Sequence, residues 1–266
     1  MLIDAHLHLP VLEGFHTYLR AKEKLLADLR RSQVDYAILI PDNQPGSPIG
    51  DVPACLELVK DAPQLFLLGT INLETQGEAW IRELERLAAE KRIVGMKIFP
   101  GHDPIYPTDP RLEPVYDLCQ TVGMPVMIHT GWNSNHPEAA QYNNPKYIVQ
   151  VAERFPDLKI VIAHYFWPEV EICFELTHGY AQIYYDTSGL ADAEVVEATG
   201  KERIEAVLVK TLSEKPRSVL FGSDYDMCSI PDHLRLVLNL PVSAEVKEGI
   251  LWRNANEVFG FKLTLG

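Results

Sequence analysis

Two histidines stand one residue apart at the start of the chain, in the segment DAHLHL at residues 4–9. Positions two apart in a β-strand face the same side, so a strand here would direct His6 and His8 together. An HxH pattern also recurs by chance, so the pair forms half of a metal site only if further ligands join it.

Further ligand types follow other short aliphatic runs. MIHTG contains His129, IAHYF contains His164, GSDYD contains Asp224 and GMKIF adds Lys97. Imidazole nitrogen and carboxylate oxygen suit Zn²⁺, and a catalytic zinc keeps one position open for water or substrate. Burying such a cluster would cost several kcal/mol unless it were paired or bound to a metal. The set therefore predicts a site for a divalent cation.

The segments that carry these residues alternate with helical ones along the chain. Between them lie segments whose apolar residues recur every three or four positions, such as GEAWIRELERLAAEKR and PKYIVQVAERFP. Successive expected strands start roughly thirty residues apart, which is the length of one strand–helix unit. Eight such units fit a closed (β/α)8 TIM barrel better than an open doubly wound sheet. We expect this α/β fold to form a single domain over residues 1–266. The expected strands are LIDAHLHL from residue 2, VDYAILIP from 34, LFLLGTIN from 65, VGMKIFP from 94, MPVMIHTG from 124, LKIVIAHYF from 158, AQIYYDTSG from 181 and SVLFGSDYD from 218.

A barrel would gather the ligand residues at one end. His6 and His8 would point into the barrel, while the apolar neighbours Ala5, Leu7 and Leu9 would face the helices. The other ionisable residues lie toward the carboxyl ends of their strands, where barrel enzymes build their active sites. Because all these residues would lie at one end of the barrel, we interpret the HxH pattern as part of a metal centre.

Composition restricts the partners of the protein. The chain has 24 Lys+Arg and 37 Asp+Glu residues, a formal net charge of −13, which would repel nucleic acid and an anionic membrane surface. The four cysteines form no CxxC pair and are expected to be reduced thiols. We find no membrane-spanning run and no signal peptide, and we therefore expect a cytoplasmic protein.

The motifs DAHLHL, GMKIF, MIHTG, IAHYF, FGSDYD and the closing RNANEVFG together resemble the amidohydrolase superfamily. More narrowly, they resemble the amidohydrolase-2 group, which includes relatives of aminocarboxymuconate-semialdehyde decarboxylase. The similarity runs over essentially the whole chain. It implies a metal-dependent (β/α)8 barrel that acts on small organic molecules, by hydrolysis in some members and by non-oxidative decarboxylation or hydration in others.

The resemblance also implies roles for individual residues. The ligands of the single-metal members match four residues here: His6, His8, His129 and Asp224. The catalytic histidine of those members matches His164. In two-metal members the histidines of strands five and six hold the second ion, with a carboxylated lysine as bridge, and Lys97 occupies a compatible position. One Zn²⁺ ion is expected, with two ions or another divalent metal as alternatives.

Several residues are interpreted as substrate contacts. Lys97 is a bridging ligand when carboxylated, a cation for a substrate carboxylate, or a structural partner of an acidic residue such as Asp224. Trp132 and His136 follow strand five and are interpreted as substrate contacts from that loop, with a loop residue that contacts no substrate as the alternative for at least one of them. Asp186 ends strand seven and is expected to line the pocket, although an Asp there also serves as a turn or capping residue.

These observations predict a metal-dependent hydrolase of a small lactone, cyclic ester or amide that uses a metal-activated water. Asp224 would transfer the proton of the water, and His164 would polarise the substrate carbonyl. The alternative is a decarboxylase or hydratase of an aromatic or unsaturated carboxylic acid on the same metal, and a third is a barrel that binds without turnover. The expected partner is a small-molecule substrate, and the protein is expected to form a homodimer.

Overall fold

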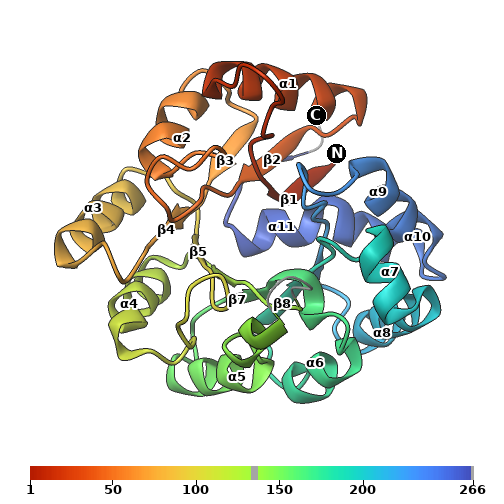
Figure 1. Cartoon of the computed structure of the whole chain (residues 1–266). Coiled ribbons are helices and arrows are strands. Elements are labelled where there is room, and N and C mark those ends of the chain that lie inside the picture. Colours follow the sequence, from red (N-terminus) through yellow and green to blue (C-terminus); the bar gives the residue numbers. More distant parts are fainter. Residues whose placement is uncertain (133–136, 265–266) are drawn as a thin grey trace.

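The computed structural model of the chain describes residues 1–132 and 137–264. Parallel strands alternate with helices around a central axis and form a (β/α)8 TIM barrel, which confirms the predicted fold (Figure 1). The strands are β1 Ile3–Leu7, β2 Tyr36–Leu39, β3 Leu65–Leu67, β4 Gly69–Thr70, β5 Met96–Ile98, β6 Val126–Ile128, β7 Ile160–Ile162, β8 Ile183–Asp186 and β9 Val219–Leu220.

The helices between the strands form the outer layer of the barrel. The longer ones are α1 Tyr18–Arg31, α2 Val52–Val59, α3 Glu78–Ala89, α4 Glu113–Val122, α5 Pro145–Arg154, α6 Val170–Thr177, α7 Ala193–Thr199, α8 Lys201–Glu214, α9 Ile230–Asn239, α10 Ala244–Glu248 and α11 Asn254–Val258. Short turns of helix complete the set: η1 Pro110–Leu112, η2 Pro137–Gln141, η3 Ala163–Phe166 and η4 Gly249–Arg253. Helical periodicity predicted α3 and α5 to within a few residues.

Hydrogen bonds close the sheet into a barrel. The strand order is β1-β2-β3 in one parallel sheet and β4 to β9 in the other. The third predicted strand is split into β3 and β4 by Leu68, whose N–H donates to Leu39 O of β2, at 3.1 Å. At the opposite seam, Ala5 N donates to Phe221 O at 2.8 Å and Asp224 N donates to His6 O at 2.9 Å. The bond between Asp224 N and His6 O brings the first and the last predicted metal ligands of the sequence side by side.

The alternation of side chains changes phase within β1. Ile3 and Ala5 belong to the cluster inside the barrel, with Ile38, Leu68 and Leu220. The prediction that Ala5 faces the helices is therefore wrong, whereas Leu7 and Leu9 do pack in the outer cluster. The pairing of β1 with β2 shifts register between Asp4 and Leu7, and this irregularity is the reason for the change.

Asp4 stabilises this irregular stretch of β1. Its Oδ1 accepts the N–H of His6 at 3.1 Å and that of Ser223 at 3.0 Å, and its Oδ2 accepts the hydroxyl of Ser223 at 2.5 Å. Gly222 allows the strands to meet here, because a Cβ on it would lie 2.9 Å from that of His6. The shift turns His6 and His8 toward the carboxyl end of the barrel interior.

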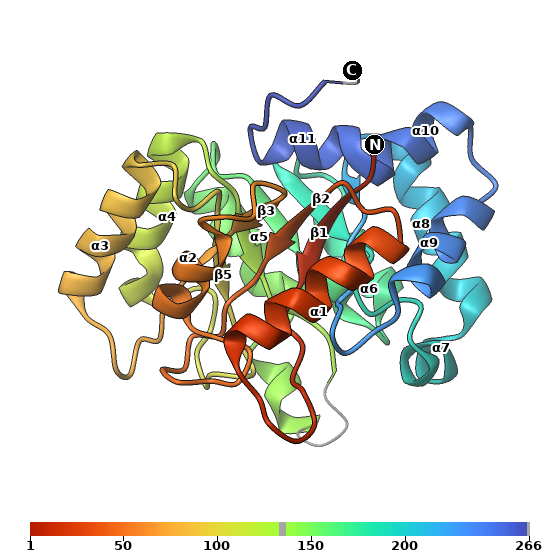
Figure 2. The ribbon, with the colours of Figure 1, turned by 90° about the horizontal axis from the view of Figure 1, so that it is seen from above.

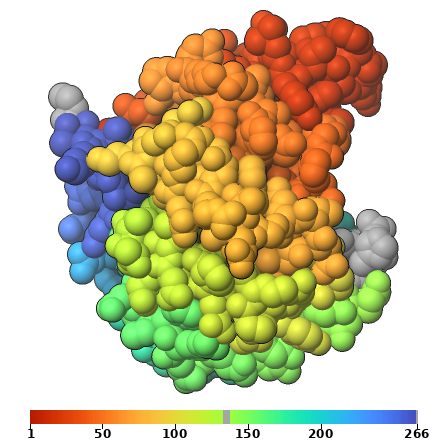
Figure 3. Space-filling model, turned by 90° about the vertical axis from the view of Figure 1, so that its left-hand side faces the viewer, coloured from red at the N-terminus to blue at the C-terminus, as the bar shows by residue number. Residues whose placement is uncertain are grey.

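The two ends of the barrel differ. Trp252, Ala255, Val258 and Phe259, from η4 to the end of α11, join the inner cluster at the amino ends of the strands. Figure 2 shows α11 across this end and the loops that follow the strands gathered at the other. In Figure 3 the colours pass in sequence order around one side, so successive units cover successive sectors. In the part of the chain that the structure describes, no helix is long and apolar enough to cross a bilayer.

Candidate metal centre

The first strand presents two imidazoles whose outer nitrogens are already bound. His6 Nδ1 lies 2.7 Å from Asp186 Oδ2, and His8 Nδ1 lies 2.9 Å from the carbonyl oxygen of Ile40. Since a carboxylate and a carbonyl only accept, each Nδ1 carries the proton and donates it. In the neutral ring Nε2 of both histidines then carries a lone pair, which can bind a cation.

Asp224 faces these two nitrogens from the strand on the other side of the seam. Its Oδ1 lies 3.5 Å from His6 Nε2 and 3.6 Å from His8 Nε2. The oxygen is buried and has no hydrogen-bond partner among the described residues. Asp224 adopts a φ of 57°, in the left-handed region that a non-glycine residue rarely enters, and such strain concentrates at functional sites.

These contacts fit a divalent cation. A buried carboxylate oxygen directed at two imidazole lone pairs has no hydrogen between the atoms, so the groups repel one another unless a positive charge lies among them. Nitrogen and oxygen donors of this kind are those that Zn²⁺ and similar metals prefer. The predicted ligands His6, His8 and Asp224 therefore meet at one place in the barrel.

His164 completes the tightest group. One ligand atom from each of His6, His164 and Asp224 lies within 4.8 Å of the others. The chain leaves β7 abruptly at this point, because His164 takes a φ of 64°, where the sequence predicted a continuing strand. The ring is held by Ser188, whose Oγ lies 2.9 Å from His164 Nδ1 and donates to Asp186 Oδ1 at 2.5 Å.

This hydrogen-bond chain fixes the tautomer of His164. The Ser188 hydroxyl gives its proton to Asp186, so it accepts from His164 Nδ1, which also lies 3.3 Å from the Ser188 carbonyl oxygen. The remaining Nε2 then carries a lone pair. This arrangement suits a metal ligand or a base, and it differs from the proton donor toward a substrate carbonyl that we expected from the sequence.

Lys97 and His129 lie beside the group. The ammonium of Lys97, on β5, is 3.4 Å from His6 Nε2 and is buried. The ring of His129 lies 4.8 Å from that of His164 and 4.4 Å from that of His102. The sequence analysis did not single out His102. Nothing in its local pattern marks it, because its position depends on how the loop after β5 folds back.

Asp186 lies beneath the ligands and is fully buried. Besides the bond to His6, its Oδ1 accepts the N–H of His164 at 2.9 Å and that of Ser188 at 3.1 Å. The expectation that Asp186 contacts a substrate does not match this location, since both oxygens bind protein donors. A carboxylate that fixes a ligating histidine is a known device for orienting the ring and raising its basicity.

Electrostatics favour the charge states that a cation needs. Burial lowers the pKa of His6 to about 3 and also lowers the pKa of His164, which favours the neutral form of both rings before Asp224 is taken into account. Burial would raise the pKa of Asp224, but the surrounding histidines, His164 first, hold it well below its usual value. Burial lowers the pKa of Lys97 to about 8, which makes its neutral amine accessible.

An open cavity of about 360 Å³ leads to these residues. His129, His164 and Asp224 line it, and so does Trp132, whose side chain is 38% exposed. This location agrees with the predicted contact between Trp132 and a substrate. His136 was predicted to contact the substrate as well, and it lies outside the described residues.

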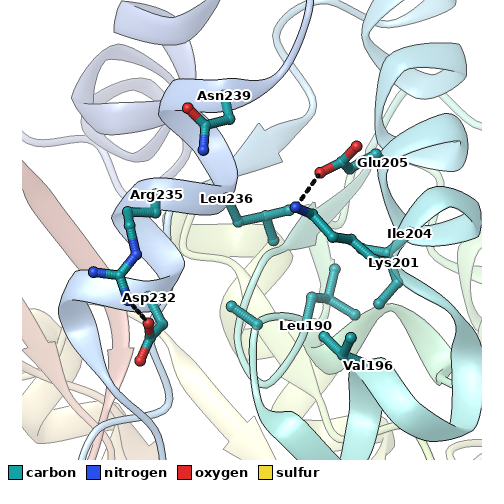
Figure 4. Close-up of a pocket in the computed structure, with 10 residues that line it drawn as sticks. Leu190, Val196, Lys201, Ile204, Glu205, Asp232, Arg235, Leu236 and Asn239 are labelled. Carbon is teal, nitrogen blue, oxygen red and sulfur yellow. Dashed lines mark hydrogen bonds and ion pairs between the residues drawn. The ribbon is translucent and has the colours of Figure 1, made fainter.

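A second cavity of about 340 Å³ lies between α7, α8 and α9. Figure 4 shows its apolar side chains, among them Leu190, Ile204 and Leu236, with Lys201 directed at Glu205. None of the residues that the sequence singled out lines this space. The cavity above Asp224 is therefore the candidate active site.

His233 supports one wall of that cavity from α9. Its buried ring donates from Nδ1 to Ser229 O at 2.9 Å and accepts the N–H of Ala191 at Nε2, at 3.2 Å. Acceptance at Nε2 requires the neutral ring, and burial lowers the pKa of His233. The contact fixes the segment between β8 and α7 that borders the cavity.

This contact predicts a pH-dependent stability. Because the folded pKa of His233 lies below the unfolded value of about 6.5, the unfolded chain binds the proton first as the pH falls. The contribution is therefore present above pH 6.5 and is lost toward pH 5. Between pH 7 and pH 5, the unfolding free energy of His233→Gln should fall by about 1 kcal/mol less than that of the wild type. Urea denaturation at the two pH values measures both changes. An unchanged slope in His233→Gln would contradict the assignment.

Comparison with known families identifies the barrel. A family model described as amidohydrolase matches residues 3–261. The chain belongs to the amidohydrolase family. This confirms the resemblance that the sequence motifs indicated. The comparison with curated proteins gives no significant match.

Solved structures share the fold at low identity. An uncharacterised TIM-barrel protein from Bordetella bronchiseptica is 22% identical over 98% of both chains, with a TM-score of 0.78. A probable 2-pyrone-4,6-dicarboxylic acid hydrolase from Acinetobacter baumannii is 17% identical over 98% of this chain and 99% of that chain, with a TM-score of 0.69. A 5-carboxyvanillate decarboxylase from Novosphingobium aromaticivorans, complexed with manganese, is 16% identical over 89% and 79%, with a TM-score of 0.67. The solved structures that share this fold thus include a probable hydrolase and a decarboxylase.

Proposed function

We propose that this amidohydrolase-family protein is a metal-dependent hydrolase of a small lactone, cyclic ester or amide. The reaction would take place where His6, His164 and Asp224 meet, at the bottom of the open cavity. We propose Zn²⁺ as the metal, with manganese as the alternative because a related decarboxylase holds it. His8 and His129 would complete the ligand set.

The observation that supports hydrolysis is the state of Asp224. Its Oδ1 is buried, unpartnered among the described residues, and ionised at neutral pH. An ionised carboxylate at the reacting centre is a base, and hydrolysis requires a base to take a proton from water. Decarboxylation instead needs an acid that delivers a proton to carbon.

When bound, a divalent cation would supply Lewis acidity and lower the pKa of water toward ~7. The chain would do the remaining work. Asp224 accepts a proton from water as the oxygen attacks the carbonyl carbon, and it then passes that proton to the leaving oxygen or nitrogen. Lys97 is a buried ammonium 3.4 Å from His6 Nε2 and would stabilise negative charge on the carbonyl oxygen.

Decarboxylation of an aromatic or unsaturated acid is the second candidate. Lys97 favours it, because a buried ammonium beside the metal centre also offers a partner for a substrate carboxylate. A 5-carboxyvanillate decarboxylase shares the fold. The two reactions differ in what they release.

The test separates metal dependence from reaction type. The protein is stripped with a chelator, reloaded with Zn²⁺ or Mn²⁺, and offered a panel of lactones and cyclic amides in weak buffer with a pH indicator. We expect proton release that requires the metal. In parallel, hydroxybenzoic acids are tested for carbon dioxide. Carbon dioxide without lactone opening would replace the first candidate by the second, and full activity in the stripped protein would contradict both.

A further inference from the structure

The rim of the cavity above the metal centre combines negative charge with aromatic surface. Asp192 and Glu194 line it at the start of α7, and no lysine or arginine does so among the residues that the structure describes. Trp132 and Trp167 line the same cavity, with their rings in edge-to-face contact 6.2 Å apart at 82°. A ligand that packs against these tryptophans would therefore share the cavity with the two carboxylates.

The rim carboxylate of Asp192 is held in place. Its Oδ1 accepts the N–H of Glu194 at 2.9 Å and caps α7. The cations of the next helix are engaged elsewhere, since Lys201 lies 3.7 Å from Glu205 and Arg203 binds Glu171. Within residues 1–132 and 137–264, no ion pair neutralises Asp192 or Glu194.

The inner end of the same cavity differs from the rim, because its residues would hold a cation. Asp224 Oδ1 is buried, without a hydrogen-bond partner among the described residues, and belongs to the group that would hold a cation. Cys228 lies between the two levels. Its N–H donates to Asp224 O at 3.0 Å, and its side chain lines the cavity together with Asp192. With the metal bound, a ligand in the cavity would thus meet a cation at its inner end and the carboxylates of Asp192 and Glu194 at its outer end.

We propose that Asp192 and Glu194 are specificity-determining residues that reject a second carboxylate and favour a ligand with an amine or another cation at its outer end. The inference rests on the proposed function, because it places the carbonyl or carboxyl end of the ligand at the metal centre. A hydrolysed lactone is a carboxylate, so a monocarboxylate serves as a product-like probe. Because the rim carboxylates repel a second anion, the substrate should carry at most one negative charge.

The test uses three probes on the same ring: benzoate, benzene-1,3-dicarboxylate and 3-(aminomethyl)benzoate. Their affinities for the metal-loaded protein are measured by calorimetry at low and high salt. We expect the amine to bind roughly tenfold or more tightly than the dicarboxylate, with a smaller ratio at high salt. The double variant Asp192→Asn/Glu194→Gln should bring the two affinities together. Asparagine caps a helix as well as aspartate does, so α7 is preserved.

A matched control removes two exposed acids outside the cavity, Glu197→Gln with Glu202→Gln, and should keep the wild-type ratio. A ratio near one in the wild type, or an unchanged ratio in the Asp192/Glu194 variant, overturns the proposal. If the protein binds metal but not benzoate, the placement of the ligand is wrong and the proposal falls while metal binding stands. If the protein binds no metal, the proposed function fails first, and metal analysis reports this separately.

Discussion

Replacing Asp224 by asparagine should abolish tight metal binding and lower turnover by about a thousandfold. The amide has the shape of the carboxylate but no charge, and its NH2 can donate to His6 Nε2 or His8 Nε2, which lie 3.5 Å and 3.6 Å from Oδ1. The lone pairs that a cation needs are then used. Metal content after dialysis and lactone hydrolysis by the reloaded protein measure the effect.

The same substitution should change the unfolding free energy of the metal-free protein by no more than about 1 kcal/mol. The surrounding histidines favour the carboxylate over its neutral form, and the asparagine loses this attraction but gains hydrogen bonds to the same rings. Asp226→Asn is the control, because that residue is two positions away and accepts the N–H of Val11 instead. A variant that holds a full equivalent of metal with normal turnover would contradict the role of Asp224.

The sequence predicted the fold and the convergence of the ligands because both depend on periodicity. Period two along a strand placed Leu7 and Leu9 in the layer that packs against the helices, as observed. The same rule was wrong at Ala5, since the register shift in β1 is fixed by the contact of Asp4 with Ser223, which is distant in sequence. Local patterns carry no record of such contacts.

The parts of the site that the sequence missed depend on backbone geometry. The expected strand over residues 158–166 ends at Ile162, and His164 then takes a left-handed conformation that no residue preference indicates. Its ring meets Ser188 from the following unit, and this contact sets the tautomer. The role of Asp186 was missed for a similar reason, because its partner His6 is 180 residues away.

Asp186→Asn should weaken metal binding by about 10–100-fold, the usual cost of losing the partner of a ligating histidine. An asparagine has one acceptor and one donor, whereas Asp186 accepts from His6 on one oxygen and from His164 and Ser188 on the other. In either orientation, the asparagine NH2 therefore faces a protein group that is itself a hydrogen-bond donor. If the NH2 faces His6, the ring must move its proton to Nε2 and ceases to be a ligand. Metal titration against a competing chelator measures the change.

Asp4→Asn is the matched control, because Asp4 is also fully buried and also contacts the first strand. Burial raises the pKa of Asp4 to about 7, so the fold already tolerates the protonated acid, which an amide imitates. The amide oxygen can accept the N–H groups of His6 and Ser223, and the NH2 can donate to the Ser223 hydroxyl. Metal affinity in Asp4→Asn should stay within about twofold of the wild type. Equal losses in both variants would mean that any buried charge near His6 matters, whereas a loss confined to Asp186→Asn ties the affinity to the proton on His6 Nδ1.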